Sequence, residues 1–174
     1  MMAGNVDYTQ GAMRNAVKKD FRDIYSSPMS QGTRCHQLAT YIVFDSPLVM
    51  LCDAPTAYRK EPECTRFIAG LPVVADETRI LQGKMGEYIV TARRVGEDWI
   101  VGGLTDWEAR TVDLDLSFLP EGMFRAEIFC DGINADKKGE DYRHEYRDVK
   151  REDRLKMQLA PGGGFAIRLK KNHN

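Results

Sequence analysis

The pattern of apolar and polar residues changes near Leu71–Pro72. Before this point the apolar residues follow helical spacing or form unbroken runs, and after it they lie in short alternating segments separated by turn residues. Helical spacing is typical of amphipathic helices, and alternation is typical of strands that bury one face. The pattern predicts a mainly β fold, with an α/β segment over residues 1–72 and antiparallel strands over residues 73–174.

Residues 33–45 form the clearest helical pattern of the first segment. Leu38, Tyr41 and Ile42 fall at helical spacing, and Thr33 is a suitable N-cap. Pro47 is expected to end this helix, because proline restricts the residue before it to extended conformations.

An unbroken apolar run, Leu48–Cys52, follows the predicted helix. Such a run is typical of a parallel strand that is buried on both faces. We expect a loop through Pro55 and Tyr58 and then a short helix over residues 63–69. This order of helix, strand and helix resembles the last repeat of a (β/α)8 barrel. A single repeat cannot close a barrel, so its apolar surface must pack on the second segment, self-associate or dock onto a missing partner.

The second segment is predicted to be an antiparallel β-sandwich. Residues 87–95 and 99–104 flank a hairpin turn at Gly96–Asp98, and residues 111–118 alternate between apolar and polar side chains. Further strands are expected at 124–130, 154–159 and 164–169. Several short strands with turns between them favour a sandwich of about 100 residues.

Composition narrows the possible partners. The chain has 174 residues, of which 43% are hydrophobic, so a packed core is expected. A net charge of -1 gives no electrostatic basis for binding nucleic acid or an acidic membrane. No apolar stretch approaches the roughly 20 residues of a membrane helix, and no signal peptide is visible.

The four cysteines, Cys35, Cys52, Cys64 and Cys130, match no zinc spacing and are interpreted as small buried apolar residues.

Several acidic residues are candidates for chemistry. Asp53 directly follows the apolar run, where barrel enzymes place residues that face the substrate; the alternative is a carboxylate that caps the loop before Pro55. Glu61 and Glu63 are two carboxyl groups close in sequence, as glycoside hydrolysis requires, but Glu63 also suits the first turn of a helix.

The acidic segment Asp131–Asp141 could offer oxygen ligands to calcium. It departs from the EF-hand pattern because Ile133 and Ala135 occupy ligand positions, so a polar loop is favoured and no metal site is assigned.

Trp99 and Trp107 could stack on sugar rings, although packing in a core is favoured. The histidines at 36, 144 and 173 are scattered, without a serine or cysteine partner at a suitable spacing.

Blocks along nearly the whole chain resemble glycoside hydrolase family 97, the α-glucosidases and α-galactosidases of gut-type bacteria. Gly32–Ala39 is similar to the family's "G-T-R-x-H-Q-L-A", and Phe44–Leu48 is similar to "Y-D-S-P-L". The opening Met1–Gly11 resembles the stretch that follows a catalytic barrel strand. Asp131–Asp136 and Leu159–Gly164 also resemble family segments, in the family's order.

The resemblance implies an N-terminal β-sandwich, a catalytic (β/α)8 barrel and a C-terminal β-sandwich in full-length members. Residues 1–72 would be the end of the barrel and residues 73–174 the C-terminal sandwich. Members hydrolyse α-glycosidic bonds with carboxylates, by inversion or retention, and many hold calcium. These groups would lie upstream of Met1, so no catalytic residue, metal ligand or cofactor is assigned to this chain. Full-length relatives are periplasmic; the location of this chain is left open.

The resemblance also places Asp7 and Tyr8 in a loop after the seventh barrel strand, close to the catalytic acid. An aromatic ring beside a carboxylate suits a sugar's apolar face and hydroxyl groups, whereas ordinary loop packing is the alternative. Asp7, Tyr8 and Asp53 are therefore the candidate substrate-binding residues.

The sequence predicts the C-terminal fragment of a family 97 α-glycosidase that is inactive alone. The full-length enzyme would bind an oligosaccharide, and this chain would associate with an N-terminal catalytic portion or with itself. The alternatives are a stand-alone carbohydrate-binding or scaffolding sandwich, and one half of a split glycosidase. The choices between glucoside and galactoside, between inversion and retention, and whether the chain is itself an enzyme, stay open.

Overall fold

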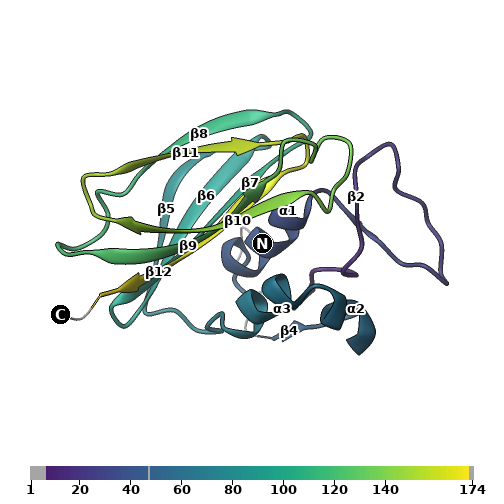
Figure 1. The fold of residues 1–174 in the computed structure, drawn as a ribbon, viewed down its shortest axis with the longest axis horizontal. Helices are drawn as coiled ribbons and strands as arrows, with labels where there is room; N and C mark the ends of the chain where they lie inside the picture. Colours follow the sequence, from purple (N-terminus) through teal and green to yellow (C-terminus); the bar gives the residue numbers. More distant parts are fainter. Residues whose placement is uncertain (1–6, 47, 173–174) are drawn as a thin grey trace.

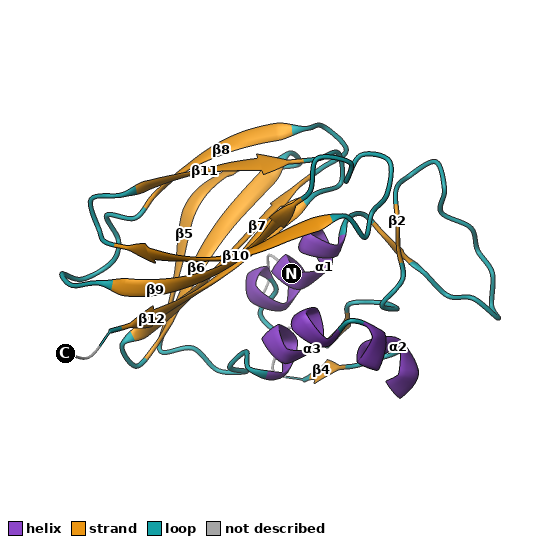
Figure 2. Cartoon of the chain, in the orientation of Figure 1, coloured by secondary structure: helices purple, strands orange, loops and turns teal. Residues whose placement is uncertain are grey.

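A computed structural model describes residues 7–46 and 48–172. The described residues form three helices and a group of longer strands, which Figure 2 colours purple and orange. The helices are α1 (Arg34–Val43), α2 (Pro55–Lys60) and α3 (Pro62–Ala69). The short strands are β1 (Tyr8–Thr9), β2 (Asn15–Ala16), β3 (Ser30–Gln31) and β4 (Val49–Met50). The longer strands are β5 (Glu77–Lys84), β6 (Tyr88–Val95), β7 (Asp98–Thr105), β8 (Arg110–Asp115), β9 (Phe124–Asp131), β10 (Tyr142–Val149), β11 (Arg154–Leu159) and β12 (Gly164–Lys171).

The centre of the molecule is a six-stranded antiparallel sheet with the order β10-β9-β12-β7-β6-β5. The two-stranded sheet β8–β11 lies over one face, and α1 and α3 lie over the other (Figure 1). The mainly β fold predicted from the sequence, with a short α/β segment before it, is confirmed. The second segment thus supplies the β layers, and the first supplies the helices on the sheet's other face.

Strand β7 shows why its apolar run is unbroken. Trp99 and Val101 face the core under β8–β11, whereas Ile100 faces the core under the helices. Successive side chains of a strand point to opposite faces, so a strand with both faces covered needs apolar residues at every position. Two layers on opposite faces therefore explain a sequence that does not alternate.

Helix α1 agrees with its prediction at the N-terminus. The Thr33 hydroxyl oxygen accepts a hydrogen bond from the backbone N–H of His36, with 3.0 Å between the heavy atoms, as an N-cap does. The helix ends at Val43, two residues earlier than expected. Pro47, its predicted terminator, lies outside the described residues, as do residues 1–6 of the opening block and His173.

The predicted strand Leu48–Cys52 is shorter and more exposed than expected. Only Val49–Met50 is a strand, paired in parallel with Tyr8–Thr9. Leu48, Met50 and Leu51 are each about half exposed. The prediction of burial on both faces is wrong for this chain, because no further strand of the described residues pairs with β1 or β4.

Three elements differ from the expectations in other ways. α2 occupies the predicted loop through Pro55 and Tyr58, and β5 and β10, the two edge strands of the sheet, were not predicted as full strands.

Cys52 is exposed, in contrast to the interpretation of all four cysteines as buried, while the other three are buried free thiols. Within the described residues, no helix is long and apolar enough to cross a membrane.

Candidate functional site

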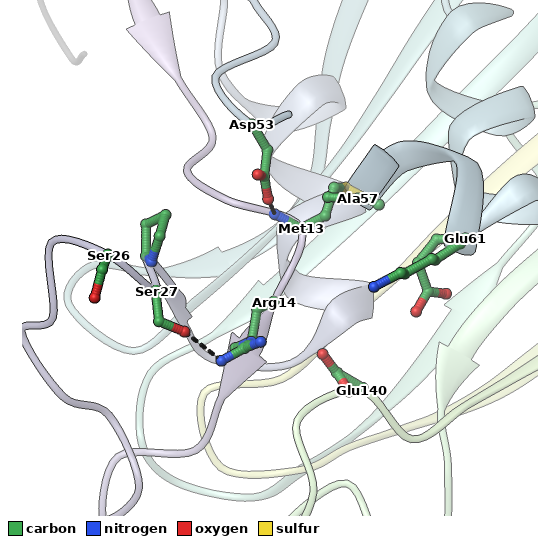
Figure 3. Close-up of a pocket in the computed structure, with 10 residues that line it drawn as sticks. Met13, Arg14, Ser26, Ser27, Asp53, Ala57, Glu61 and Glu140 are labelled. Carbon is green, nitrogen blue, oxygen red and sulfur yellow. Dashed lines mark hydrogen bonds between the residues drawn. The ribbon is translucent and has the colours of Figure 1, made fainter. Parts of the chain in front are cut away.

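A polar cavity of about 340 Å³ lies where the chain leaves the parallel strands β1 and β4 (Figure 3). The segment after β1 contributes Met13 and Arg14, and the segment after β4 contributes Asp53. Loop residues and the start of the helical pair complete the wall: Ser26, Ser27, Pro28, Ala57, Lys60, Glu61 and Glu140. The cavity therefore lies at the carboxyl ends of two parallel strands, the edge where α/β barrels bind their substrates.

Asp53 holds the segments that follow the two strands together. One carboxylate oxygen accepts a hydrogen bond from the Met13 backbone N–H (2.7 Å) and the other from the Ala54 N–H (2.6 Å). The Asp53 backbone N–H donates to the Tyr58 hydroxyl oxygen, 3.2 Å away. Asp53 thus caps its loop, the alternative weighed from the sequence, and it also lines the cavity.

Asp7 and Tyr8 do not line this cavity. Asp7 is exposed, and Tyr8 belongs to strand β1 rather than to a loop after a strand. The Tyr8 ring packs edge-on against Phe44, with 4.7 Å between ring centroids, and burial raises the pKa of its hydroxyl. The structure separates these two residues from Asp53's cavity, and their contact with substrate stays a prediction.

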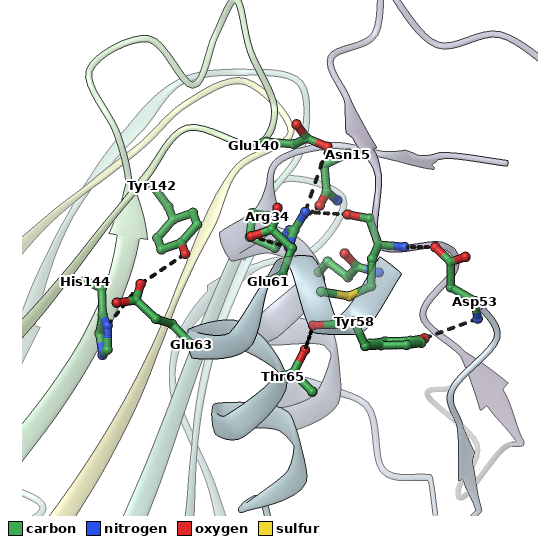
Figure 4. A network of polar contacts seen from close by, with 12 residues as sticks. Asn15, Arg34, Asp53, Tyr58, Glu61, Glu63, Thr65, Glu140, Tyr142 and His144 are labelled. Carbon is green, nitrogen blue, oxygen red and sulfur yellow. Dashed lines mark hydrogen bonds and ion pairs between the residues drawn. The ribbon is translucent and has the colours of Figure 1, made fainter. Parts of the chain in front are cut away.

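Arg34, a residue not selected from the sequence, organises the polar network beside the cavity (Figure 4). Its side chain is 1% exposed, its Nε donates to Asn15 Oδ1 (2.5 Å), and its Nη2 donates to the Met13 carbonyl oxygen. Glu61 forms an ion pair with it at 3.5 Å, and Glu140 lies 3.9 Å away. A buried cation needs such partners to offset its lost hydration. In the sequence, this role of Arg34 is indicated by its position directly after the N-cap Thr33, on the face of α1 that becomes buried.

The two carboxylates of Glu61 and Glu63 have separate partners. Glu61 pairs with Arg34, whereas Glu63 accepts a hydrogen bond from the Tyr142 hydroxyl (3.1 Å) and lies 3.5 Å from His144 Nδ1. Figure 4 shows Glu61 beside Arg34, and Glu63 beside Tyr142 and His144. This arrangement favours structural ion pairs over the acid and base of a glycosidase.

The acidic segment 131–141 consists of the last residue of β9 and the hydrogen-bonded loop that follows it. Asp131 is buried, and its Oδ2 accepts the backbone N–H groups of Ala160 (2.9 Å) and Gly164 (3.0 Å). Burial raises the pKa of Asp131 to about 6, outweighing the hydrogen bonds that favour its ionised form. Asp141 accepts the Asn134 N–H at 2.8 Å. Among residues 7–46 and 48–172, no group of three His, Cys, Asp or Glu side chains is arranged to hold a metal ion.

The tryptophans and the remaining described histidine have packing roles. Trp99 is 2% exposed and contacts Phe118 in the core, as the sequence favoured. Trp107 is partly exposed and covers the turn at Gly162, where its ring would clash with any side chain. His36 Nδ1 lies 3.1 Å from the Gly163 carbonyl oxygen, and burial lowers the pKa of the ring.

Comparisons with known proteins identify the lineage of this chain. Residues 74–170 match the family described as "Glycosyl-hydrolase 97 C-terminal, oligomerisation". The retaining alpha-galactosidase of Bacteroides thetaiotaomicron is 57% identical over 169 residues, which cover 97% of this chain and 26% of that protein. A probable retaining alpha-galactosidase of Streptomyces bingchenggensis is 27% identical over 94% of this chain and 23% of that protein.

Solved structures agree with the sequence match. A glycoside hydrolase family 97 enzyme from Pseudoalteromonas sp. strain K8, in complex with acarbose, superimposes with a TM-score of 0.86 and 34% identity. The match covers 99% of this chain and 27% of that enzyme, so this chain spans about a quarter of the length of these relatives. The chain therefore belongs to glycoside hydrolase family 97, and it corresponds to the C-terminal part of the family's enzymes.

Proposed function

We propose that this chain is the C-terminal part of a retaining α-galactosidase and that it completes a catalytic barrel supplied by an upstream portion. The observation that carries the proposal is the isolated parallel pair β1–β4, with Leu48, Met50 and Leu51 half exposed beside it. Parallel strands occur almost only in sheets with both faces covered. The pair is therefore suited to receive neighbouring strands and a covering layer.

The cavity gives this part of the protein a direct role at the substrate. It lies at the carboxyl edge of β1 and β4, where a completed barrel binds its ligand. Arg14, Lys60 and Asp53 would line one side of the barrel mouth and contact sugar hydroxyl groups. Asp7, which directly precedes β1, and Tyr8, which lies in β1, stay second candidates for sugar contact.

Galactoside specificity and retention are proposed from the relatives. The 57% identity to a retaining alpha-galactosidase exceeds the 34% identity to the enzyme solved with acarbose. We propose no hydrolysis by the isolated chain, because Glu61 forms an ion pair with Arg34 and Glu63 accepts a hydrogen bond from the Tyr142 hydroxyl. A stand-alone sugar-binding module is less well supported, since Trp99, one of its two proposed platforms, is buried.

Calcium and self-association complete the proposal. The family resemblance implies calcium in full-length members, but here Asp53 binds backbone N–H groups, and Glu61 and Glu140 face Arg34. These carboxylates do not fit as calcium ligands, so we place the ligands in the upstream portion. The family match over residues 74–170 is to a domain described by oligomerisation, so a second copy is the other proposed partner.

A chimeric enzyme tests the function. The matching last quarter of the Bacteroides retaining alpha-galactosidase is replaced by this chain, and hydrolysis of p-nitrophenyl α-galactoside is measured. We expect activity in the chimera and none in this chain alone or in the Bacteroides protein lacking that quarter. Hydrolysis by the isolated chain, or a well-folded but inactive chimera, would contradict the proposal.

A further inference from the structure

His144 of strand β10 lies between helix α3 and the six-stranded sheet. Its ring stacks on Phe129 of β9, with 4.0 Å between centroids and 13° between planes, and its side chain is 12% exposed. The stacking restricts the plane of the ring, in which both nitrogens lie. The imidazole is therefore a rigid element of the contact between α3 and the sheet.

Each ring nitrogen faces a carboxylate from a different element. Nδ1 lies 3.5 Å from Glu63 Oε2 at the start of α3, and Nε2 lies 3.2 Å from Glu127 Oε1 on β9. A neutral imidazole carries one N–H and can donate to only one of these oxygens, leaving a lone pair directed at the other. The protonated ring has two N–H groups, so it can donate from Nε2 to Glu127 while its positive charge attracts Glu63 at the ion-pair distance of Nδ1. Both carboxylates therefore have a favourable contact only when the ring is protonated.

We propose that protonation of His144 fastens α3 to the sheet, so that the position of this helix depends on pH. Histidine is the side chain that changes charge most readily near neutral pH. A neutral ring keeps one hydrogen bond, and the carboxylate opposite its lone pair is repelled. The proposal stands on the geometry and is independent of the proposed function.

The other charged and titratable groups around His144 limit how far its protonation changes the attachment of α3 to the sheet. The Tyr142 hydroxyl donates to Glu63, the Tyr146 hydroxyl donates to Glu127, and both bonds persist when His144 is neutral. Arg168 of β12 lies 3.7 Å from Glu127 and donates to the Phe67 carbonyl oxygen of α3. Two further cations lie near Tyr146, Arg66 on α3 and Arg125 on β9. α3 therefore loosens without leaving the sheet.

The helix connects this contact to the polar cavity. Glu61, which lines the cavity and pairs with Arg34, is two residues before Glu63. A displacement of Glu63 moves the first turn of α3 and with it the Glu61 carboxylate. The inferred pH dependence therefore extends to one wall of the cavity, and His144 is a positioning residue for it.

Amide hydrogen exchange of the 174-residue chain tests the proposal. Protection of residues 64–69 in α3 is compared with that of β7 between pH 5.5 and 8, after correction for intrinsic exchange rates. Titration of the His144 ring is followed by NMR. We expect α3 protection to fall about fivefold as His144 loses its proton, as for an ion pair with a half-exposed partner, with β7 unchanged.

Three variants separate the interpretations. Glu63→Gln should remove the pH dependence of α3, and His144→Phe should keep the stacking and hold α3 at or below its high-pH protection at every pH. Glu145→Gln removes the same charge from the next, exposed position of β10 and should behave as the wild type. Protection of α3 that does not follow His144, that changes equally in β7, or that keeps its pH dependence in Glu63→Gln would overturn the proposal.

Discussion

Gly102 of β7 lies directly beneath Ile42 of α1. A Cβ atom added to Gly102 would lie 2.9 Å from Ile42 Cβ and 3.0 Å from the Ala39 carbonyl oxygen. Both atoms are part of, or fixed to, the helix backbone, so no side-chain rotation relieves the contact. Glycine at this position therefore sets the distance between α1 and the sheet.

We predict that Gly102→Ala destabilises the chain by about 1–3 kcal/mol, because α1 must move away from the sheet to admit the methyl group. Urea denaturation measures the change. Gly83→Ala on the exposed edge strand β5 is the control, since its added methyl group would meet its nearest neighbour at 3.3 Å. Equal effects of the two substitutions would show that the close contact with α1 is not the cause.

Asp131 should make stability depend on pH in a particular direction. Its pKa is raised from 3.8 to about 6, so the folded state binds this proton more tightly than the unfolded state. The stabilisation is complete below about pH 4 and is lost as the pH rises through about 6.

The variant Asp131→Asn keeps one oxygen for the N–H groups of Ala160 and Gly164 and removes the titration. Relative to the wild type it should gain on the order of 2 kcal/mol in unfolding free energy between pH 4 and pH 7. Urea midpoints at several pH values check this, with Asp113→Asn, an exposed carboxylate, as control. A difference from the wild type that stays constant with pH would refute the assignment.

The ion pair between Arg34 and Glu61 predicts that removing the Glu61 carboxylate lowers the free energy of unfolding. In Glu61→Gln the buried guanidinium keeps Asn15 and the Met13 carbonyl but loses its nearest charge, and we expect about 1–2 kcal/mol of destabilisation. Glu152→Gln removes an exposed partner 4.0 Å from Lys150 and should change stability by less than about 0.5 kcal/mol. Denaturation of both variants is the comparison; similar values would mean that Arg34 is compensated without Glu61.

The half-exposed residues beside β4 should matter in the assembled enzyme more than in the isolated chain. Met50→Gln combined with Leu51→Gln is expected to leave the unfolding free energy of this chain within about 0.5 kcal/mol. In the chimera with the Bacteroides barrel, the same pair should lower the melting temperature, because two polar side chains would then be buried. An unchanged chimera would indicate that this surface stays in water.

The sequence predicted the elements whose residues follow one periodicity. The alternating strand β8 and the capped helix α1 carry such a pattern, whereas β6 and β7 were predicted from the hairpin turn Gly96–Asp98 between them. β5 and β10 carry none, because edge strands of this sheet are largely exposed and need no apolar alternation. The short parallel strands β1 to β3 are two residues each, too short for any period to be visible.

The candidate site was predictable only in part. Asp53 was found because it directly follows an apolar run, a local signal. Arg34, Glu61 and Glu140 come together from three separate regions of the chain, and the spacing of residues along the sequence does not contain that contact. His144 likewise had no visible partner, since Glu63 and Glu127 lie 81 and 17 residues before it.

The position of β12 in the sheet constrains how the chain folds. β12 is the last strand of the described residues, yet it lies between β9 and β7. Until residues 164–171 leave the ribosome, the sheet can exist only as two unjoined halves, β10–β9 and β7–β6–β5. The sheet face that receives α1 is incomplete over the same period. Formation of the complete sheet therefore waits for β12, and loss of residues 164–171 would remove a strand from the middle of the sheet rather than fray an edge.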